Sequence, residues 1–249
     1  MTTLEILKTT RAAWPSVRDI PEERRNRLLM AMADRLLSES EAILAANRLD
    51  LEAARGSISE VMLDRLRLDK KRLEGMADGV RAIAALPAQV EQILSNREQI
   101  QYYASQYFNH DSVFFIGRNL DYALGMEGSL KLKEISYIHS EAYASGELKH
   151  GTISLIEPGT LVVALGSYTP LFDKAMSNVI EVKARGASVL ALATESHRAE
   201  MESRVDGILT IPDTELMFLP LLGVVPLQLF AYYVALQRGC DIDKPRNLA

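Results

Sequence analysis

Residues 161–193 read LVVALGSYTPLFDKAMSNVIEVKARGASVLALA and carry the clearest signal of the fold. This segment begins with an apolar run, Leu161 to Leu165, and ends with another, Ser188 to Ala193. Between them, apolar residues recur at helical spacing from about Phe172 to Arg185, and Gly186 follows where a helix would stop. A strand, a helix and a second buried strand in this order are typical of a parallel sheet.

Two further apolar runs extend the pattern outward. Residues 112–116 precede it and are closed by Gly117, and residues 207–211 follow it. Helical sequence covers residues 121–137 and 218–238. Strands that alternate with helices predict an α/β domain whose parallel sheet carries helices on both faces. Neither a glycine-rich dinucleotide loop nor a phosphate-binding P-loop follows any of these strands.

Residues 1–88 have a different character, because they contain helical patterns and no strand-like alternation of any length. We expect the last of these helices to end at Leu86-Pro87 and a linking helix to follow over about residues 89–107. Charge changes at the same place: residues 1–88 hold 15 Lys plus Arg and 14 Asp plus Glu, whereas residues 89–249 hold 13 and 19. We therefore predict a helical segment, 1–88, and an α/β domain, 89–249.

Composition excludes several classes of protein. Cys240 is the single cysteine, so neither a disulfide framework nor a multi-cysteine metal site can form, and the four histidines have no metal-ligand spacing. We expect no cofactor and no metal. The longest apolar stretch, residues 217–236, is interrupted by Pro and Gly and reads as a buried helix. The first residues lack a signal-peptide pattern and no basic face is interleaved with aromatics, so we expect a cytoplasmic chain without nucleic-acid or membrane partners.

Candidate chemistry gathers between residues 127 and 151. Glu127, Lys131 and Glu134 are spaced so that they share one helix face. Such a stripe can be a solvated ion-pair surface, or a carboxylate whose basicity is set by a neighbouring ammonium for proton transfer. His150 lies in a Gly-Glu-Leu-Lys-His-Gly segment, where the flanking glycines indicate a loop or helix end. Pattern alone leaves both readings of these residues open.

Longer motifs resemble a known family. They are Glu127-Gly-Ser-Leu-Lys131-Leu-Lys-Glu134-Ile-Ser-Tyr-Ile-His139, Gly146-Glu-Leu-Lys-His150-Gly151, Phe115-Ile-Gly117-Arg118, Lys183-Ala-Arg-Gly186, Val225-Pro-Leu-Gln228 and Pro245-Arg-Asn-Leu-Ala249. Residues 89–249 with these motifs resemble the second, C-terminal sugar-isomerase (SIS) lobe of the glutamine–fructose-6-phosphate aminotransferases, which make glucosamine 6-phosphate. The resemblance implies an αβα sandwich around a five-stranded parallel sheet.

The same resemblance implies roles for three residues. Glu134 would be the base that moves a proton between C1 and C2 of fructose 6-phosphate, and Lys131 beside it would tune or relay protons. His150 would assist ring opening in the site of a neighbouring subunit, which makes a homodimer the expected assembly.

Departures from the family pattern weaken the expectation of activity. In the family, a lysine that forms an imine with the sugar follows the Pro-Arg-Asn-Leu-Ala motif, whereas this sequence stops at Ala249. The first SIS lobe with its Ser/Thr-rich phosphate loop is absent from the sequence, as is the glutaminase domain, and Thr2 stands where that domain needs a cysteine. We therefore expect a lobe that is incomplete and weakly active or inactive alone. The alternative is a non-catalytic module for sugar-phosphate binding or dimerisation.

The first 88 residues resemble a second family, on residues 43–47, 50–55, 59–66 and 72–87. These segments are similar to the leading helices of gamma-glutamyl phosphate reductases, NADPH-dependent enzymes of proline biosynthesis. The two resemblances meet near Leu86-Pro87-Ala88, so we interpret the chain as a chimera or recombined fragment. A reductase remnant is accordingly a further alternative for its function.

Overall fold

The computed structural model describes residues 2–248 and divides into two compact units, Met1–Ala85 and Leu86–Ala249. The described part of the first unit is helical, as its sequence predicts. It contains α1 (Thr3–Arg18), α2 (Glu22–Ser38), α3 (Ser40–Ala54), α4 (Glu60–Leu66) and the first part of α5 (Lys70–Ser95).

The described residues of the first unit bury few apolar side chains, which are Ala33, Leu63, Leu73 and Ala77. A polar side chain fastens the loop after α4: the Asn47 amide donates to the carbonyl of Leu66 at 2.9 Å and accepts from the N–H of Leu68 at 2.8 Å. Asn47 is itself buried, and both polar atoms of its amide have partners.

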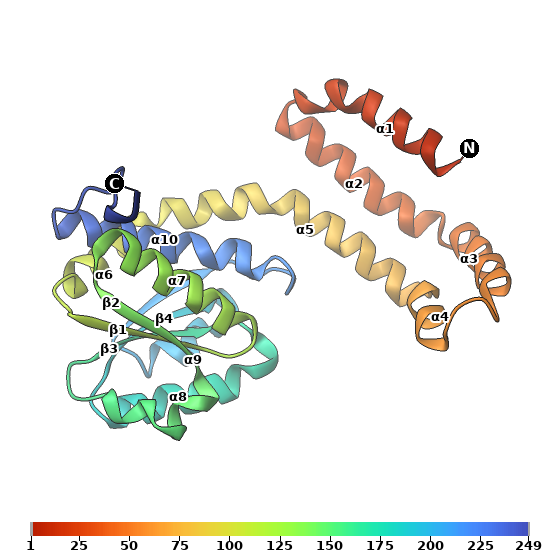
Figure 1. Cartoon of the computed structure of the whole chain (residues 1–249). Helices are drawn as coiled ribbons and strands as arrows, with labels where there is room; N and C mark the ends of the chain where they lie inside the picture. Colours follow the sequence, from red (N-terminus) through yellow and green to blue (C-terminus); the bar gives the residue numbers. More distant parts are fainter. Residues whose placement is uncertain (1, 249) are drawn as a thin grey trace. The chain divides into compact units, whose positions relative to one another are not determined.

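The second unit is built on a five-stranded parallel sheet with the order β2-β1-β3-β4-β5 (Figure 1). Its strands are β1 (Ser112–Gly117), β2 (His139–Ala144), β3 (Leu161–Gly166), β4 (Ser188–Thr194) and β5 (Gly207–Ile211). The strand order reverses between β1 and β3, which is where parallel sheets of this kind commonly open a crevice at their carboxyl edge.

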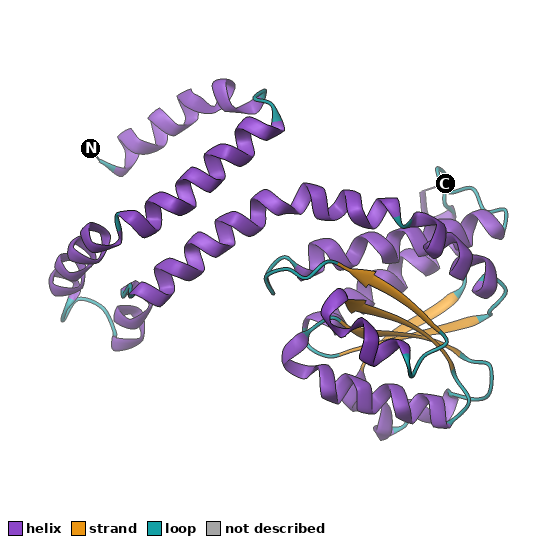
Figure 2. Cartoon of the chain, turned by 180° about the vertical axis from the view of Figure 1, so that it is seen from behind, coloured by secondary structure: helices purple, strands orange, loops and turns teal. Residues whose placement is uncertain are grey.

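Helices cover both faces of this sheet, which confirms the predicted αβα architecture (Figures 1 and 2). Side chains of α6 (Arg97–Tyr107), α7 (Leu120–Ser136) and α10 (Leu219–Gln237) pack on one face. Those of α8 (Phe172–Ala184) and the short α9 (Arg198–Glu202) pack on the other. Short 3-10 turns complete the unit: η1 (Ser145–His150), η2 (Thr152–Leu155), η3 (Thr169–Leu171), η4 (Glu195–His197) and η5 (Arg246–Leu248).

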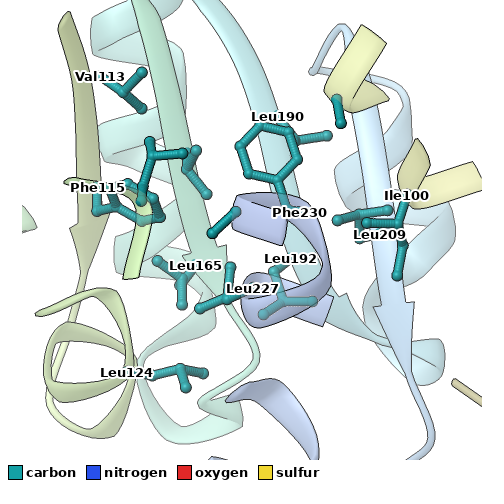
Figure 3. Packing of buried hydrophobic residues seen from close by; sticks show 14 of the residues in the cluster. Ile100, Val113, Phe115, Leu124, Leu165, Leu190, Leu192, Leu209, Leu227 and Phe230 are labelled. Atoms are coloured by element: carbon teal, nitrogen blue, oxygen red, sulfur yellow. The ribbon is translucent and has the colours of Figure 1, made fainter. Parts of the chain in front are cut away.

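The α10 helix forms the centre of the larger core. Figure 3 shows Leu227 and Phe230 of α10 among apolar side chains of the sheet, including Leu190 and Leu192 of β4. By length and composition α10 could cross a membrane, but half of its apolar window is buried inside this unit. It therefore packs as the buried helix that its Pro and Gly interruptions predicted.

Two local predictions are wrong. The helix expected to end at Leu86-Pro87 continues as α5 through Pro87 to Ser95, and the expected linking helix is the end of α5 followed by α6. Periodicity also missed β2, which only the family resemblance implied. This strand lies at the sheet edge with Ser140 as its single buried residue, so it lacks the apolar run by which the other strands were found.

Candidate functional site

The last two turns of α7 bring Lys131 and Glu134 together. The Lys131 ammonium donates to Glu134 Oε2 at 2.7 Å, whereas Glu127 Oε1 lies 3.9 Å from the same nitrogen. The side chains of Lys131 and Glu134 are 32% and 24% exposed, so the pair is partly accessible to solvent. The predicted shared face is therefore present, and its tight contact is the one between Lys131 and Glu134.

This contact changes the acidity of both groups. The hydrogen bond from Lys131, followed by one from Asn247, lowers the pKa of Glu134 below its ordinary value. The hydrogen bond to Glu134 raises the pKa of Lys131. At neutral pH the site thus holds a carboxylate and an ammonium, which together can accept a proton and stabilise developing negative charge.

The C-terminal segment folds back over the end of α7. Asn247 Nδ2 donates to Glu134 Oε1 at 3.0 Å, and the backbone N–H of Arg246 donates to the Tyr137 hydroxyl at 3.2 Å. The Arg246 guanidinium also lies 4.0 Å from the centroid of the Tyr137 ring. Tyr137 caps α7 in the left-handed conformation with φ of 61°, which turns the chain toward β2.

Two hollows flank the Lys131–Glu134 pair. One of about 310 Å³ is lined by Leu130, Lys133, Glu134, Tyr137, Arg246 and Asn247. The other, of about 390 Å³, is lined by Leu94, Lys131, Ile135, Val225, Gln228, Leu229 and Tyr232 and is mostly apolar. The carboxylate therefore lines one hollow and the ammonium lines the other, and apolar surface predominates in both.

His150 is the third predicted site residue, and a single chain does not bring it to Glu134. It ends η1, beyond the carboxyl end of β2, whereas Glu134 precedes the amino end of the same strand. Six residues of strand span about 17–20 Å, so the two side chains lie at opposite ends of β2. The His150 ring is 74% exposed, with Glu147 Oε2 3.9 Å away.

The carboxyl edge between β1 and β3 is closed by hydrogen bonds. The Ser167 hydroxyl and the Tyr168 N–H both donate to the Asp121 carboxylate, and Asp121 and Ser167 are buried. Burial raises the pKa of Asp121, although these hydrogen bonds oppose the rise. The Asp121 carboxylate therefore already takes the hydrogen bonds that the loop after β3 offers at this edge.

The described residues contain no group of three or more His, Cys, Asp or Glu that could hold a metal ion. Cys240 is partly buried and its Sγ faces the carbonyl of Ser136 at 3.8 Å. The contacts of Asn247 and Tyr137 at this site were not predicted from the sequence. Their only sequence signals are the two family motifs that contain them, neither of which says that they meet.

Comparison with known proteins identifies the second unit. The family model described as "SIS domain" matches residues 106–238. A glutamine–fructose-6-phosphate aminotransferase [isomerizing] from Caldanaerobacter subterraneus subsp. tengcongensis is 58% identical over 164 residues, which are 66% of this chain and 27% of that protein. The chain thus spans about a quarter of the length of this curated relative.

Two further matches differ in extent. The enzyme of the same name from Gluconobacter oxydans is 38% identical over 208 residues, 84% of this chain and 32% of that protein. The structure of the C-terminal domain of glucosamine-fructose-6-phosphate aminotransferase from Francisella tularensis has a TM-score of 0.63 and 32% identity, covering 73% of this chain and 50% of that one. The second unit of the present chain is homologous to the C-terminal lobe of these enzymes, and the chain belongs to the SIS domain family.

Proposed function

We propose that the second unit binds fructose 6-phosphate and moves a proton between C1 and C2 of the open-chain sugar. The hydrogen bond between Lys131 and Glu134 carries this proposal. Glu134 accepts the proton from C1 and returns it to C2, while a second proton passes from O1 to O2, so the ketose becomes an aldose without an oxidant. In the presence of ammonia, the same site contributes to formation of glucosamine 6-phosphate.

The ion pair suits this task for a physical reason. A carboxylate that is ionised at neutral pH is ready to accept a proton, and the adjacent ammonium stabilises the negative charge that develops on the sugar oxygens. The hollow lined by Glu134 has a volume of about 310 Å³, in the lower range of small-molecule sites.

We further propose that the working assembly is a homodimer in which His150 acts in the site of the other copy. The exposed His150 ring and its distance from Glu134 along β2 support this arrangement. An apolar surface is available on α7, where Met126 and Leu130 are 46% and 47% exposed one turn apart.

The test measures conversion of fructose 6-phosphate to glucose 6-phosphate, and to glucosamine 6-phosphate with added ammonia. We expect slow turnover that Glu134→Gln abolishes, because the amide cannot accept the proton. Glu98→Gln, in an exposed position on α6 outside the site, is the matched control and should retain the wild-type rate. Turnover that survives Glu134→Gln, or a chain that neither turns over nor binds fructose 6-phosphate by calorimetry, would overturn the proposal.

One alternative has an observation in its favour. The exposed apolar surface on α7 also suits a dimerisation module that binds sugar phosphates without reacting. Calorimetric binding of fructose 6-phosphate and dimerisation in sedimentation, without turnover, would select it. For both candidate functions, we expect the protein to act in the cytoplasm. The reductase resemblance of residues 1–88 remains a prediction, and NADPH binding by the chain is its test.

A further inference from the structure

The two oxygens of the Glu134 carboxylate have different partners. Lys131 on the same helix donates to Oε2 at 2.7 Å, and Asn247 from the C-terminal segment donates to Oε1 at 3.0 Å. The first contact is local, three residues apart, and the second joins positions 113 residues apart. A carboxylate held at both oxygens cannot rotate about its last torsion without breaking one bond, and each oxygen keeps a lone pair for a further contact.

Tyr137 provides the anchor that brings Asn247 to this position. Its hydroxyl accepts the N–H of Arg246, and its ring lies under the Arg246 guanidinium. Both contacts are made by Arg246, the residue directly before Asn247. They therefore fix the backbone from which the Asn247 amide extends. Tyr137 and Arg246 line the same hollow as Glu134, which places the anchor at the wall of the site.

We propose that Asn247 is a positioning residue for Glu134: docking of Arg246 on Tyr137 places the Asn247 amide so that it holds the carboxylate plane toward the hollow. Lys131 alone would hold Oε2 and leave Oε1 free to turn. The contact between Asn247 and Glu134 is present whether or not the chain catalyses a reaction. Its importance for proton transfer rests on the proposed function. A base acts efficiently only when its lone pair is held toward the proton.

The experiment follows the titration of Glu134 directly, without substrate. The carbon-13 signal of its carboxyl group is assigned by its loss in Glu134→Gln. In Asn247→Ala the hydrogen bond to the ionised form is lost, so the pKa of Glu134 should rise toward its ordinary value. In Asn247→Asp a like charge replaces the donor, so the pKa should rise further than in Asn247→Ala.

Asn109→Ala is the matched control, because Asn109 is an exposed asparagine in the turn after α6 and outside the site. It should leave the titration of Glu134 unchanged, and circular dichroism should show that every variant is folded. If Asn247→Ala and Asn247→Asp titrate like Asn109→Ala, the positioning role is refuted. A shift in a chain without turnover would leave the positioning intact and refute only the proposed function.

Where turnover is measurable, the split between kcat and KM separates positioning from binding. If Asn247→Ala leaves the Glu134 carboxylate wrongly oriented, kcat should fall with little change in KM, because the sugar is still bound. A rise in KM at constant kcat would instead assign Asn247 to substrate binding and overturn the positioning role.

Discussion

The Lys131–Glu134 hydrogen bond should make part of the folding stability depend on pH. Because the pKa of Glu134 is lowered in the folded chain, its contribution is fully present above the pKa of the unfolded chain and is lost as pH falls through the folded value. We therefore expect the wild type to be more stable than Glu134→Gln at about pH 7 and the difference to shrink toward about pH 3. Urea unfolding across this range measures it.

Glu127→Gln is the control for this prediction, since Glu127 lies 3.9 Å from the Lys131 ammonium and makes no hydrogen bond to it. Its stability should follow the wild type more closely at every pH. A difference between wild type and Glu134→Gln that stays constant down to low pH would show that the ion pair does not contribute through ionisation.

Gly117 makes the turn from β1 into α7 possible. A Cβ atom at this position would lie 2.5 Å from the backbone carbonyl of Asp121 and 2.7 Å from the backbone nitrogen of Tyr122. Backbone atoms of a packed helix cannot give way as a flexible side chain can, so Gly117→Ala should destabilise the second unit by about 3 kcal/mol, the upper range for overpacking. Denaturant unfolding followed by far-ultraviolet circular dichroism measures this loss of stability.

Gly75→Ala shows whether the effect comes from the added methyl group alone. Gly75 lies in α5 with open space around its Cα, so this substitution should stabilise the helix by up to about 1 kcal/mol. Equal effects of the two substitutions would contradict the close approach at Gly117.

At the scale of elements, the sequence predicted what apolar patterning controls. The strands β1, β3, β4 and β5 are buried on both faces and appear as apolar runs, and α10 appears as the longest apolar stretch. The β2 strand has no such run because only Ser140 of its residues is buried, whereas the other edge strand, β5, is almost fully buried. At the site, spacing placed Lys131 beside Glu134, whereas no local pattern could reveal a contact made by Asn247 from 113 residues away.

The α5 helix continues through Pro87, although proline usually ends or kinks a helix. Proline lacks the N–H that would donate to Ile83 and its ring crowds that carbonyl, which is why a helix end was predicted there. Leu86, Val90 and Ile93 nevertheless pack on the core of the second unit, so the helix continues.

Pro87→Ala should consequently stabilise α5. The substitution restores a backbone hydrogen bond and removes the steric conflict, a gain of about 1–3 kcal/mol in the helix. Amide hydrogen exchange should slow at residues 84–91, and the thermal midpoint should rise. Faster exchange there would mean that the chain needs the proline at this position. Ala85→Gly, two residues before Pro87 in the same helix, is the opposing control and should speed exchange.

At the scale of the whole molecule, the two units differ in how much they bury. The second unit contains two apolar clusters, one on each face of its sheet, whereas the described residues of the first bury four apolar side chains. The match to the Gluconobacter oxydans protein covers 84% of the chain, more than the second unit alone, so part of the helical unit also aligns with that relative. Similarity to this family therefore does not stop at the boundary between the units.

The separation of Glu134 and His150 along β2 has a consequence for the assembly. If one site uses Glu134 from one copy and His150 from the other, Glu134→Gln and His150→Ala should each be inactive when pure. Mixed after joint unfolding and refolding, half of the dimers should be heterodimers. One of their two sites carries both substitutions and the other carries neither, so the mixture should regain about a quarter of the wild-type activity.

The regained activity must depend on exchange of chains, because no new residue is made in the mixture. Mixing the two variants without unfolding should restore activity only as fast as dimers exchange their chains, and a tethered dimer of the double variant should stay inactive. Independent sites within each chain predict instead that the refolded mixture never exceeds the two variants alone. The mixing experiment therefore distinguishes a shared site from two separate ones through a positive result rather than through a loss of activity.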